Sequence, residues 1–143
     1  AVRGVLEEIL LQQPASLVIA NRTKSKAVQL AADFTTLGNI NGCGLDEIGE
    51  RSFDIVINGT SASLQGDLPP LPGTLFKTGA CSYDMMYAAQ PTPFMQWSTE
   101  NGAEQVFDGL GMLVEQAAES FSIWRGIKPE TAEVITAIRD SLS

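Results

Sequence analysis

The sequence predicts an α/β protein with a Rossmann-like, doubly wound and mainly parallel sheet, and with helices gathered at its carboxyl end. Short apolar runs rich in β-branched residues alternate with segments of helical periodicity. This alternation is typical of a parallel sheet covered by helices on both faces. The run Phe53-Asp54-Ile55-Val56-Ile57-Asn58 is almost continuously apolar, as expected of a strand buried on both faces. No internal repeat interrupts the pattern, so residues 1–143 are interpreted as one domain.

Three helices and two strands are predicted in the first third of the chain. Residues 2–12 have a helical periodicity that stops near Pro14. An apolar strand at 16–20 leads directly into a helix at about 23–34, a weak strand with glycines spans 37–43, and a short helix follows at 45–48. The apolar faces of the two longer helices are Val5, Leu6, Ile9 and Leu10 in the first, and Ala27, Leu30, Ala31 and Phe34 in the second.

Three strands and three helices are predicted in the remainder. The strand at 53–58 ends at Gly59-Thr60-Ser61, and prolines mark a surface loop at 69–73. A strand at 80–85 precedes a helix that begins at Thr92, and a short strand at 103–106 precedes the longest helix, which follows Asp108-Gly109. Pro129 is expected at the first position of the last helix. In the longest helix, Glu115 and Glu119 face away from an apolar stripe. The stripe consists of Leu110, Leu113, Val114, Ala117, Ala118, Phe121 and Trp124.

The first strand of a Rossmann-like sheet is absent from this order of elements. Such a strand and its G-x-G-x-x-G turn precede the first helix, whose amino terminus carries the pyrophosphate. Residues 2–12 look like that helix, so the strand and the glycines are expected upstream of Ala1. A sheet without this strand would expose two long unpaired edges.

The composition narrows the functional classes. The net charge is −8, from 9 basic and 17 acidic residues, and such a surface disfavours nucleic acid as a partner. No apolar run approaches the roughly 20 residues that span a bilayer, so no membrane partner is expected. The chain has no histidine, and no metal site is predicted. Cys43 and Cys81 lack C-x-x-C spacing, which favours buried free thiols and a cytoplasmic protein.

The turn Asn21-Arg22-Thr23 follows the strand at 16–20 and indicates a cofactor. In a dinucleotide-binding domain, an acid at this strand end bonds the ribose hydroxyls of NAD, whereas an Arg accommodates the 2′-phosphate of NADP. The chain offers Arg22, with Lys26 one helical turn further on. The acid or Arg is expected about 20 residues beyond the G-x-G-x-x-G motif of a Rossmann domain, and Arg22 falls at that position. The alternative is a plain helix cap, in which Thr23 bonds the orphan N–H groups of the first turn.

Six motifs, in order, resemble the carboxyl-terminal, NADP-binding part of the shikimate dehydrogenase family. Any one of them is weak, but the last is quite specific and the series covers the chain to about Ala117. The family patterns are the tail of GAGGAxR, then NRTxxK/R, INxTS, YDxxY, TPF and DGxGMLVxQA. They match Ala1-Val2-Arg3-Gly4, Asn21-Arg22-Thr23 with Lys26, Ile57-Asn58-Gly59-Thr60-Ser61, Tyr83-Asp84-Met85-Met86-Tyr87, Thr92-Pro93-Phe94 and the run from Asp108 to Ala117.

The resemblance implies a role for each of the matched residues. Arg22 and Lys26 would hold the 2′-phosphate of NADP, and the remaining cofactor-binding residues would be Ala1, Asn21, Thr23, Thr60, Ser61, Met85 and Gly109. Tyr87 and Gln116 would reach hydroxyl groups of shikimate. Non-functional alternatives remain open for three of these residues. Gln116 is then a solvated residue beside the apolar stripe, Tyr87 covers the edge of the core with its hydroxyl in water, and Met85 packs inside a buried strand.

The reaction implied by the resemblance is the reduction of 3-dehydroshikimate to shikimate with NADPH, a step of aromatic amino-acid and chorismate biosynthesis. The Lys and Asp that handle the proton belong to the family's amino-terminal substrate domain, so no catalytic residue is expected in this chain and the chain alone is expected to be inactive. Residues 110–142 are expected to pack back toward that domain. A non-catalytic NADP-binding domain, a quinate-using paralogue and a homodimeric assembly are left open.

Overall fold

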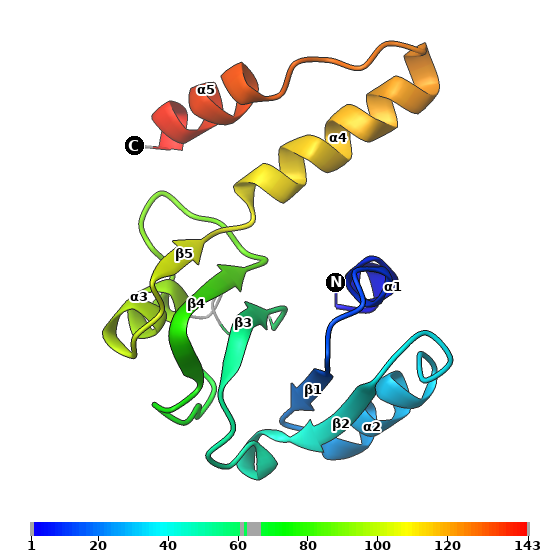
Figure 1. Cartoon of the computed structure of the whole chain (residues 1–143). Coiled ribbons are helices and arrows are strands. Elements are labelled where there is room, and N and C mark those ends of the chain that lie inside the picture. Colours follow the sequence, from blue (N-terminus) through cyan, green and yellow to red (C-terminus); the bar gives the residue numbers. More distant parts are fainter. Residues whose placement is uncertain (1, 61, 63–66, 143) are drawn as a thin grey trace. The chain divides into compact units, whose positions relative to one another are not determined.

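The computed structural model describes residues 2–60, 62 and 67–142 of the chain. They form two compact units, which fall within Ala1–Ser52 and Leu68–Leu75 for the first and within Phe53–Asp67 and Phe76–Ser143 for the second. Figure 1 labels the helices and strands of both units. Every strand pair among the described residues is parallel, which confirms the predicted α/β class. No described helix is both long and apolar enough to cross a membrane.

The first unit is a strand–helix–strand unit preceded by a helix. Strand β1 pairs with β2, with Leu17 opposite Ile40 and Asn21 opposite Gly44, and helix α2 connects the two strands and packs on them (Figure 1). The close packing requires glycine at position 42, because a Cβ there would lie 2.3 Å from the carbonyl oxygen of Ala27. The elements are α1 (Arg3–Leu11), β1 (Leu17–Asn21), α2 (Lys24–Ala32), β2 (Ile40–Gly44) and a 3₁₀ helix (Leu45–Glu47).

The core of the first unit contains the helix faces predicted from the sequence. Ala27 and Ala31 of α2 are buried, and Leu30 and Phe34 pack against the same cluster. In α1 the buried positions are Leu6 and Leu10, whereas Val5 and Ile9 are only half-buried. Ile19 and Ile40 complete the cluster from the two strands.

The second unit contains a three-stranded sheet in the order β3-β4-β5. Helix α3 packs against β4 and β5, and the chain turns after α4 so that α5 runs back beside it (Figure 1). The elements are β3 (Phe53–Asn58), β4 (Phe76–Asp84), α3 (Pro93–Glu100), β5 (Gln105–Phe107), α4 (Leu110–Arg125) and α5 (Ala132–Leu142).

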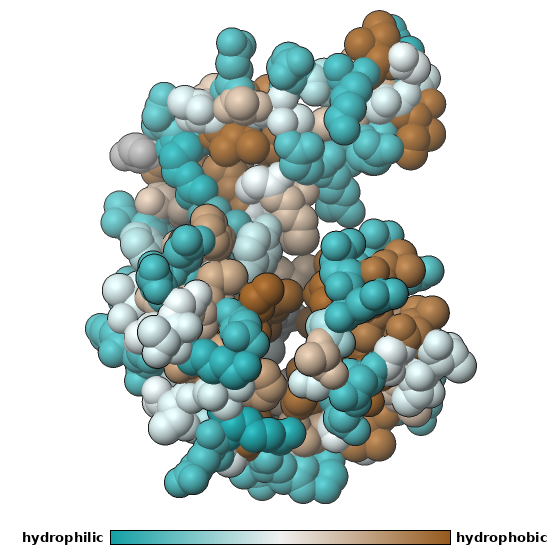
Figure 2. Space-filling view, in the orientation of Figure 1, coloured by the Kyte–Doolittle hydropathy of each residue, from teal (hydrophilic) through white to brown (hydrophobic). Residues whose placement is uncertain are grey.

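Burial in the second unit departs from the sequence prediction at two places. Strand β3 has the predicted bounds, but Ile55 and Ile57 are 61% and 41% exposed, because no helix of this unit packs extensively on β3 among the described residues. The stripe of α4 is buried only in its first half, at Leu110, Val114 and Ala118. Its second half is exposed, and Figure 2 shows hydrophobic residues gathered over the carboxyl-terminal end of α4.

The last helix begins later than predicted. Pro129 precedes α5 by three residues, and the carbonyl of Thr131 accepts the N–H of Ile135 as the helix starts. The hydroxyl of Thr131 donates to Glu115 on α4, so the start of α5 is fixed by a contact between helices. The thiols of Cys43 and Cys81 are free, with Cys43 buried and Cys81 only partly so.

Candidate functional site

The carboxyl end of β1 turns into α2 through a short polar turn. The side chain of Asn21 accepts the backbone N–H of Thr23 at 2.8 Å, which closes the turn. Thr23 occupies the N-cap position of α2, but its side chain makes no capping hydrogen bond. The helix-cap alternative for this turn is therefore wrong, and the Thr23 hydroxyl is not committed to the first turn of the helix.

Three cations surround the amino terminus of α2, where the helix dipole is positive and acids rather than bases are stabilising. The first turn of α2 contains no acid. Lys24 is neutralised, since its ammonium group pairs with Glu47, and this hydrogen bond raises the pKa of Lys24 and lowers that of Glu47. The side chains of Arg22 and Lys26 are exposed and have no hydrogen-bond or ion-pair partner among the described residues. Two uncompensated cations at a helix amino terminus form a site suited to an anion.

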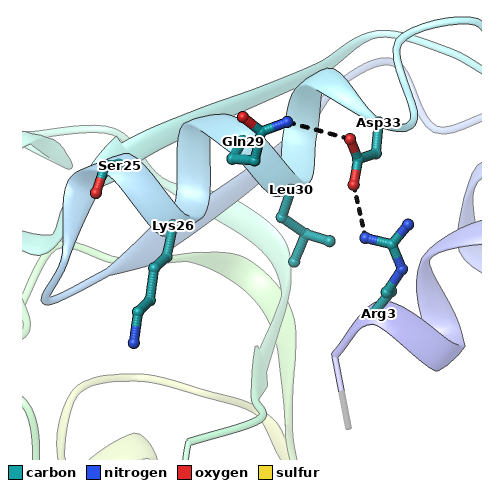
Figure 3. Close-up of a pocket in the computed structure, with 6 residues that line it drawn as sticks. All are labelled: Arg3, Ser25, Lys26, Gln29, Leu30 and Asp33. Atoms are coloured by element: carbon teal, nitrogen blue, oxygen red, sulfur yellow. Dashed lines mark hydrogen bonds and ion pairs between the residues drawn. The ribbon is translucent and has the colours of Figure 1, made fainter.

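Lys26 also lines an open groove of about 460 Å³ between α1 and α2. Figure 3 shows Lys26 and Arg3 on two sides of this groove, with Arg3 directed toward Asp33. The Arg3 guanidinium lies 2.6 Å from Asp33 and stacks over Phe34 at 5.4 Å. Hydrogen bonds from Arg3 and Gln29 lower the pKa of Asp33, so Arg3 is compensated in a way that Lys26 is not.

In the second unit, the carboxyl ends of β3 and β4 are joined by a buried polar network. Asp84 is fully buried. Its Oδ1 accepts from the side-chain amide of Asn58 and the backbone N–H of Met86, both at 3.1 Å, and its Oδ2 accepts from the Thr92 hydroxyl at 2.5 Å. Thr92 caps α3 by accepting the N–H of Met95. Sequence reasoning missed this network, although each of its three side chains lies in a motif that was recognised.

The predicted cofactor residues of the second unit adjoin this network. Asn58 Oδ1 accepts both the backbone N–H and the hydroxyl of Thr60, at 3.1 and 2.8 Å. Met85 is half-buried and lies just after β4 rather than inside a buried strand, and its N–H donates to the Asn58 carbonyl. Gly109 donates to the Met86 carbonyl at 2.9 Å. A Cβ at Gly109 would lie 2.2 Å from the Met85 carbonyl oxygen, so this glycine is required by protein packing alone.

The predicted substrate residues are exposed. Tyr87 is 38% exposed after the end of β4, and Gln116 is exposed on α4. Neither side chain has a hydrogen-bond partner among the described residues. Both are available to a ligand, and both are also compatible with the solvated alternatives. The predicted cofactor residues Ala1 and Ser61 lie outside the described residues.

The two acids at the strand ends have separate roles. Asp108 accepts two hydrogen bonds from Arg139 of α5, at 2.6 and 2.8 Å, and it also caps α4 by accepting the N–H of Leu110. The hydrogen bonds from Arg139 lower the pKa of Asp108. Burial raises the pKa of Tyr83, and the Asp108 charge adds to this effect. Asp84 and Asp108 are thus each held by a separate set of hydrogen-bond donors.

Comparison with known proteins adds independent information. A family model described as the Shikimate 5'-dehydrogenase C-terminal domain matches residues 109–139. The chain is 58% identical to the shikimate dehydrogenase (NADP(+)) of Cellvibrio japonicus and 52% identical to that of Saccharophagus degradans, over 99% of its length in both cases. It covers 51% and 53% of those two proteins, so the chain spans about half the length of the curated relatives it matches.

Solved structures give the same result. The fold matches an Ael1 enzyme from Pseudomonas putida with a TM-score of 0.83 and 43% identity, over 99% of this chain and 51% of that one. It matches a shikimate dehydrogenase in complex with NADP+ with a TM-score of 0.73 and 27% identity, over 90% of this chain and 47% of that one. The Rossmann-like fold and the resemblance to shikimate dehydrogenases are thereby confirmed.

Proposed function

We propose that this chain is the carboxyl-terminal, cofactor-binding half of an NADP-dependent shikimate dehydrogenase that interconverts 3-dehydroshikimate and shikimate. The observation that carries the proposal is the pair of uncompensated cations, Arg22 and Lys26, at the carboxyl end of β1. Lys24 lies between them and is neutralised by Glu47. The site therefore has two charges available for a phosphate, and the chain has no acid in the turn at residues 21–23 that would bind the ribose hydroxyls of NAD.

NADP fits the residues that are present. Arg22 and Lys26 bind the 2′-phosphate by charge-assisted hydrogen bonds, and the uncommitted Thr23 hydroxyl and the Asn21 turn border the same group. Thr60, Met85 and Gly109 orient the other end of the dinucleotide at the carboxyl ends of β3 and β4, the side of a parallel sheet where ligands bind. When bound, the nicotinamide ring accepts or donates the hydride. Tyr87 and Gln116 bind hydroxyl groups of the substrate.

The carboxyl-terminal helices are proposed to contact an amino-terminal substrate domain. Four apolar side chains near the end of α4 support this proposal, because a surface of this kind is typical of an interface. Phe121 is 45% exposed, Ile123 74%, Trp124 79% and Ile127 66%. The proton-handling Lys and Asp are expected in that domain. The free thiols of Cys43 and Cys81 support a cytoplasmic location.

An activity assay of the intact protein tests the proposal. Shikimate and NADP+ are mixed with the protein that joins this chain to its amino-terminal region, and NADPH formation is followed by absorbance. We expect turnover with shikimate and NADP+, much less with NAD+, and none from residues 1–143 alone. Turnover with quinate but not shikimate would favour the paralogue, and NADP+ binding without turnover of either substrate would favour a non-catalytic domain.

A further inference from the structure

Three sequence motifs meet at one buried carboxylate. Asn58 belongs to the Ile57–Ser61 motif, Asp84 to the Tyr83–Tyr87 motif and Thr92 to the Thr92–Phe94 motif. Asp84 accepts hydrogen bonds from the side chains of the other two, which lie 26 and 8 residues away in sequence. All three side chains are buried, so none of them is exposed to a ligand. Their polar groups contact one another and the neighbouring backbone.

The hydrogen-bond directions in this network follow from groups that can act in only one way. The backbone N–H of Thr60 can only donate, so the Asn58 atom that faces it is the carbonyl oxygen Oδ1. The Asn58 amide nitrogen then faces Asp84. Since Asn58 Oδ1 can only accept, the Thr60 hydroxyl, 2.8 Å away, must be the donor to it. The hydroxyl hydrogen of Thr60 is therefore used inside the protein, and only its lone pairs are available to a ligand.

The network also holds the backbone of the predicted cofactor residues. Met86 N–H is bonded to Asp84 Oδ1, and Met85 N–H is bonded to the Asn58 carbonyl. Gly109 is tied to this segment by its hydrogen bond to the Met86 carbonyl. A displacement of the Asp84 carboxylate would thus move Thr60 through Asn58, and Met85 and Gly109 through Met86.

We propose that Asp84 and its partners Asn58 and Thr92 are positioning residues for the cofactor, and that they present Thr60 to the dinucleotide purely as a hydrogen-bond acceptor. This inference rests on the proposed NADP function. The ligand group that meets Thr60 must be a donor, which at the nicotinamide end of this cofactor is a carboxamide N–H or a ribose hydroxyl. Thr60 therefore discriminates against ligand groups that can only accept.

The positioning role is tested at Thr92, which touches no ligand. Thr92→Val removes the hydrogen bond to Asp84 Oδ2 together with the cap of α3, whereas Thr92→Ser retains both. In the intact protein we expect Thr92→Val to weaken NADP+ binding by about tenfold, the effect of losing one buried hydrogen bond to a charged group. We expect Thr92→Ser to stay within about twofold of wild type. Binding is measured by calorimetry at a temperature at which every variant is folded.

A core substitution in the same helix separates positioning from general destabilisation. Phe94 is buried and has no polar group in the network, so Phe94→Leu is expected to lower the thermal midpoint without weakening NADP+ binding. If Phe94→Leu and Thr92→Val weaken binding equally, or if Thr92→Val binds NADP+ as tightly as wild type, the positioning role is refuted. Absence of NADP+ binding by the wild-type protein would instead refute the proposed function.

The acceptor role is tested at Thr60 with two cofactors. Thr60→Val removes the acceptor at nearly constant shape, and the acetylpyridine analogue of NADP+ lacks the carboxamide N–H. If the carboxamide is the donor, Thr60→Val weakens NADP+ binding but not analogue binding. If a ribose hydroxyl is the donor, it weakens both equally. Undiminished binding of both cofactors by Thr60→Val would overturn the acceptor role.

Discussion

Gly109→Ala should destabilise the second unit, because a Cβ at this position has no space. It would lie 2.2 Å from the carbonyl oxygen and 2.7 Å from the carbonyl carbon of Met85. Gly109 has φ −81°, so alanine fits the backbone conformation and only the contact opposes it. Ordinary van der Waals contact would require the segments around Gly109 and Met85 to separate by about 1 Å, next to the hydrogen bond from Gly109 to Met86. Overpacking of this kind typically costs about 1–3 kcal/mol, and a rigid backbone neighbour places the change at the upper end.

Gly111 provides the matched control two residues later. A Cβ there meets nothing within 4 Å, and Gly111 lies inside α4, where alanine is favoured over glycine by up to about 1 kcal/mol. We therefore expect the two alanine variants to differ in sign, with Gly109→Ala lowering and Gly111→Ala raising the free energy of unfolding in urea. Equal stabilities for the two variants, or a stabilised Gly109→Ala, would refute the packing argument.

Two further predictions concern the carboxyl-terminal helices. Arg139→Met should cost about 1 kcal/mol at neutral pH, a value discounted because Arg139 is 42% exposed. Since Arg139 lowers the pKa of Asp108, this stabilisation is present above about pH 4 and is lost as the pH falls through the lowered pKa. The difference in thermal midpoint between wild type and variant should therefore shrink toward zero in acid, and a constant difference would contradict the ion pair. Trp124 is 79% exposed in this chain, and the proposed contact with the amino-terminal domain would cover it in the intact protein. In the intact Trp97→Phe protein we therefore expect weak quenching of the Trp124 fluorescence by iodide. Strong quenching would argue against the proposed domain contact.

The sequence predicts those features that depend on local pattern. The alternation of apolar runs with segments of helical periodicity is sufficient to predict that the strands are parallel. The spacing of Ala27, Leu30, Ala31 and Phe34 likewise identifies the buried face of α2. The end of β1 and the turn that carries Arg22 are also visible in sequence, because a β-branched run stops at polar residues. What sequence could not reveal is that Lys24 is neutralised, since Glu47 comes from a segment 23 residues away.

Features that depend on long-range contacts were missed for the same reason. Asp84 lies within the strand predicted at 80–85, but nothing local indicates that Asn58 and Thr92 converge on it. The apolar run at 53–58 predicts that Ile55 is buried, but Ile55 is exposed. The sequence of a strand does not show which of its faces are covered by its own unit. Proline generally favours the first turn of a helix, which predicts that the last helix begins at Pro129. The contact between Thr131 and α4 instead fixes the start of α5 at Ala132.

The central claim is that Arg22 and Lys26 provide the charge that distinguishes NADP from NAD. The most direct measurement is the ratio of NADP+ to NAD+ affinities, by calorimetry, for the intact wild-type protein and Arg22→Ala. Lys24→Ala serves as the control, since that cation is already paired with Glu47. Loss of one charge-assisted phosphate contact should cost about 1.5–3 kcal/mol, so Arg22→Ala should weaken NADP+ binding by roughly 10- to 150-fold and leave NAD+ binding and the Lys24→Ala ratio near wild type. Equal weakening of both cofactors by Arg22→Ala would contradict the claim.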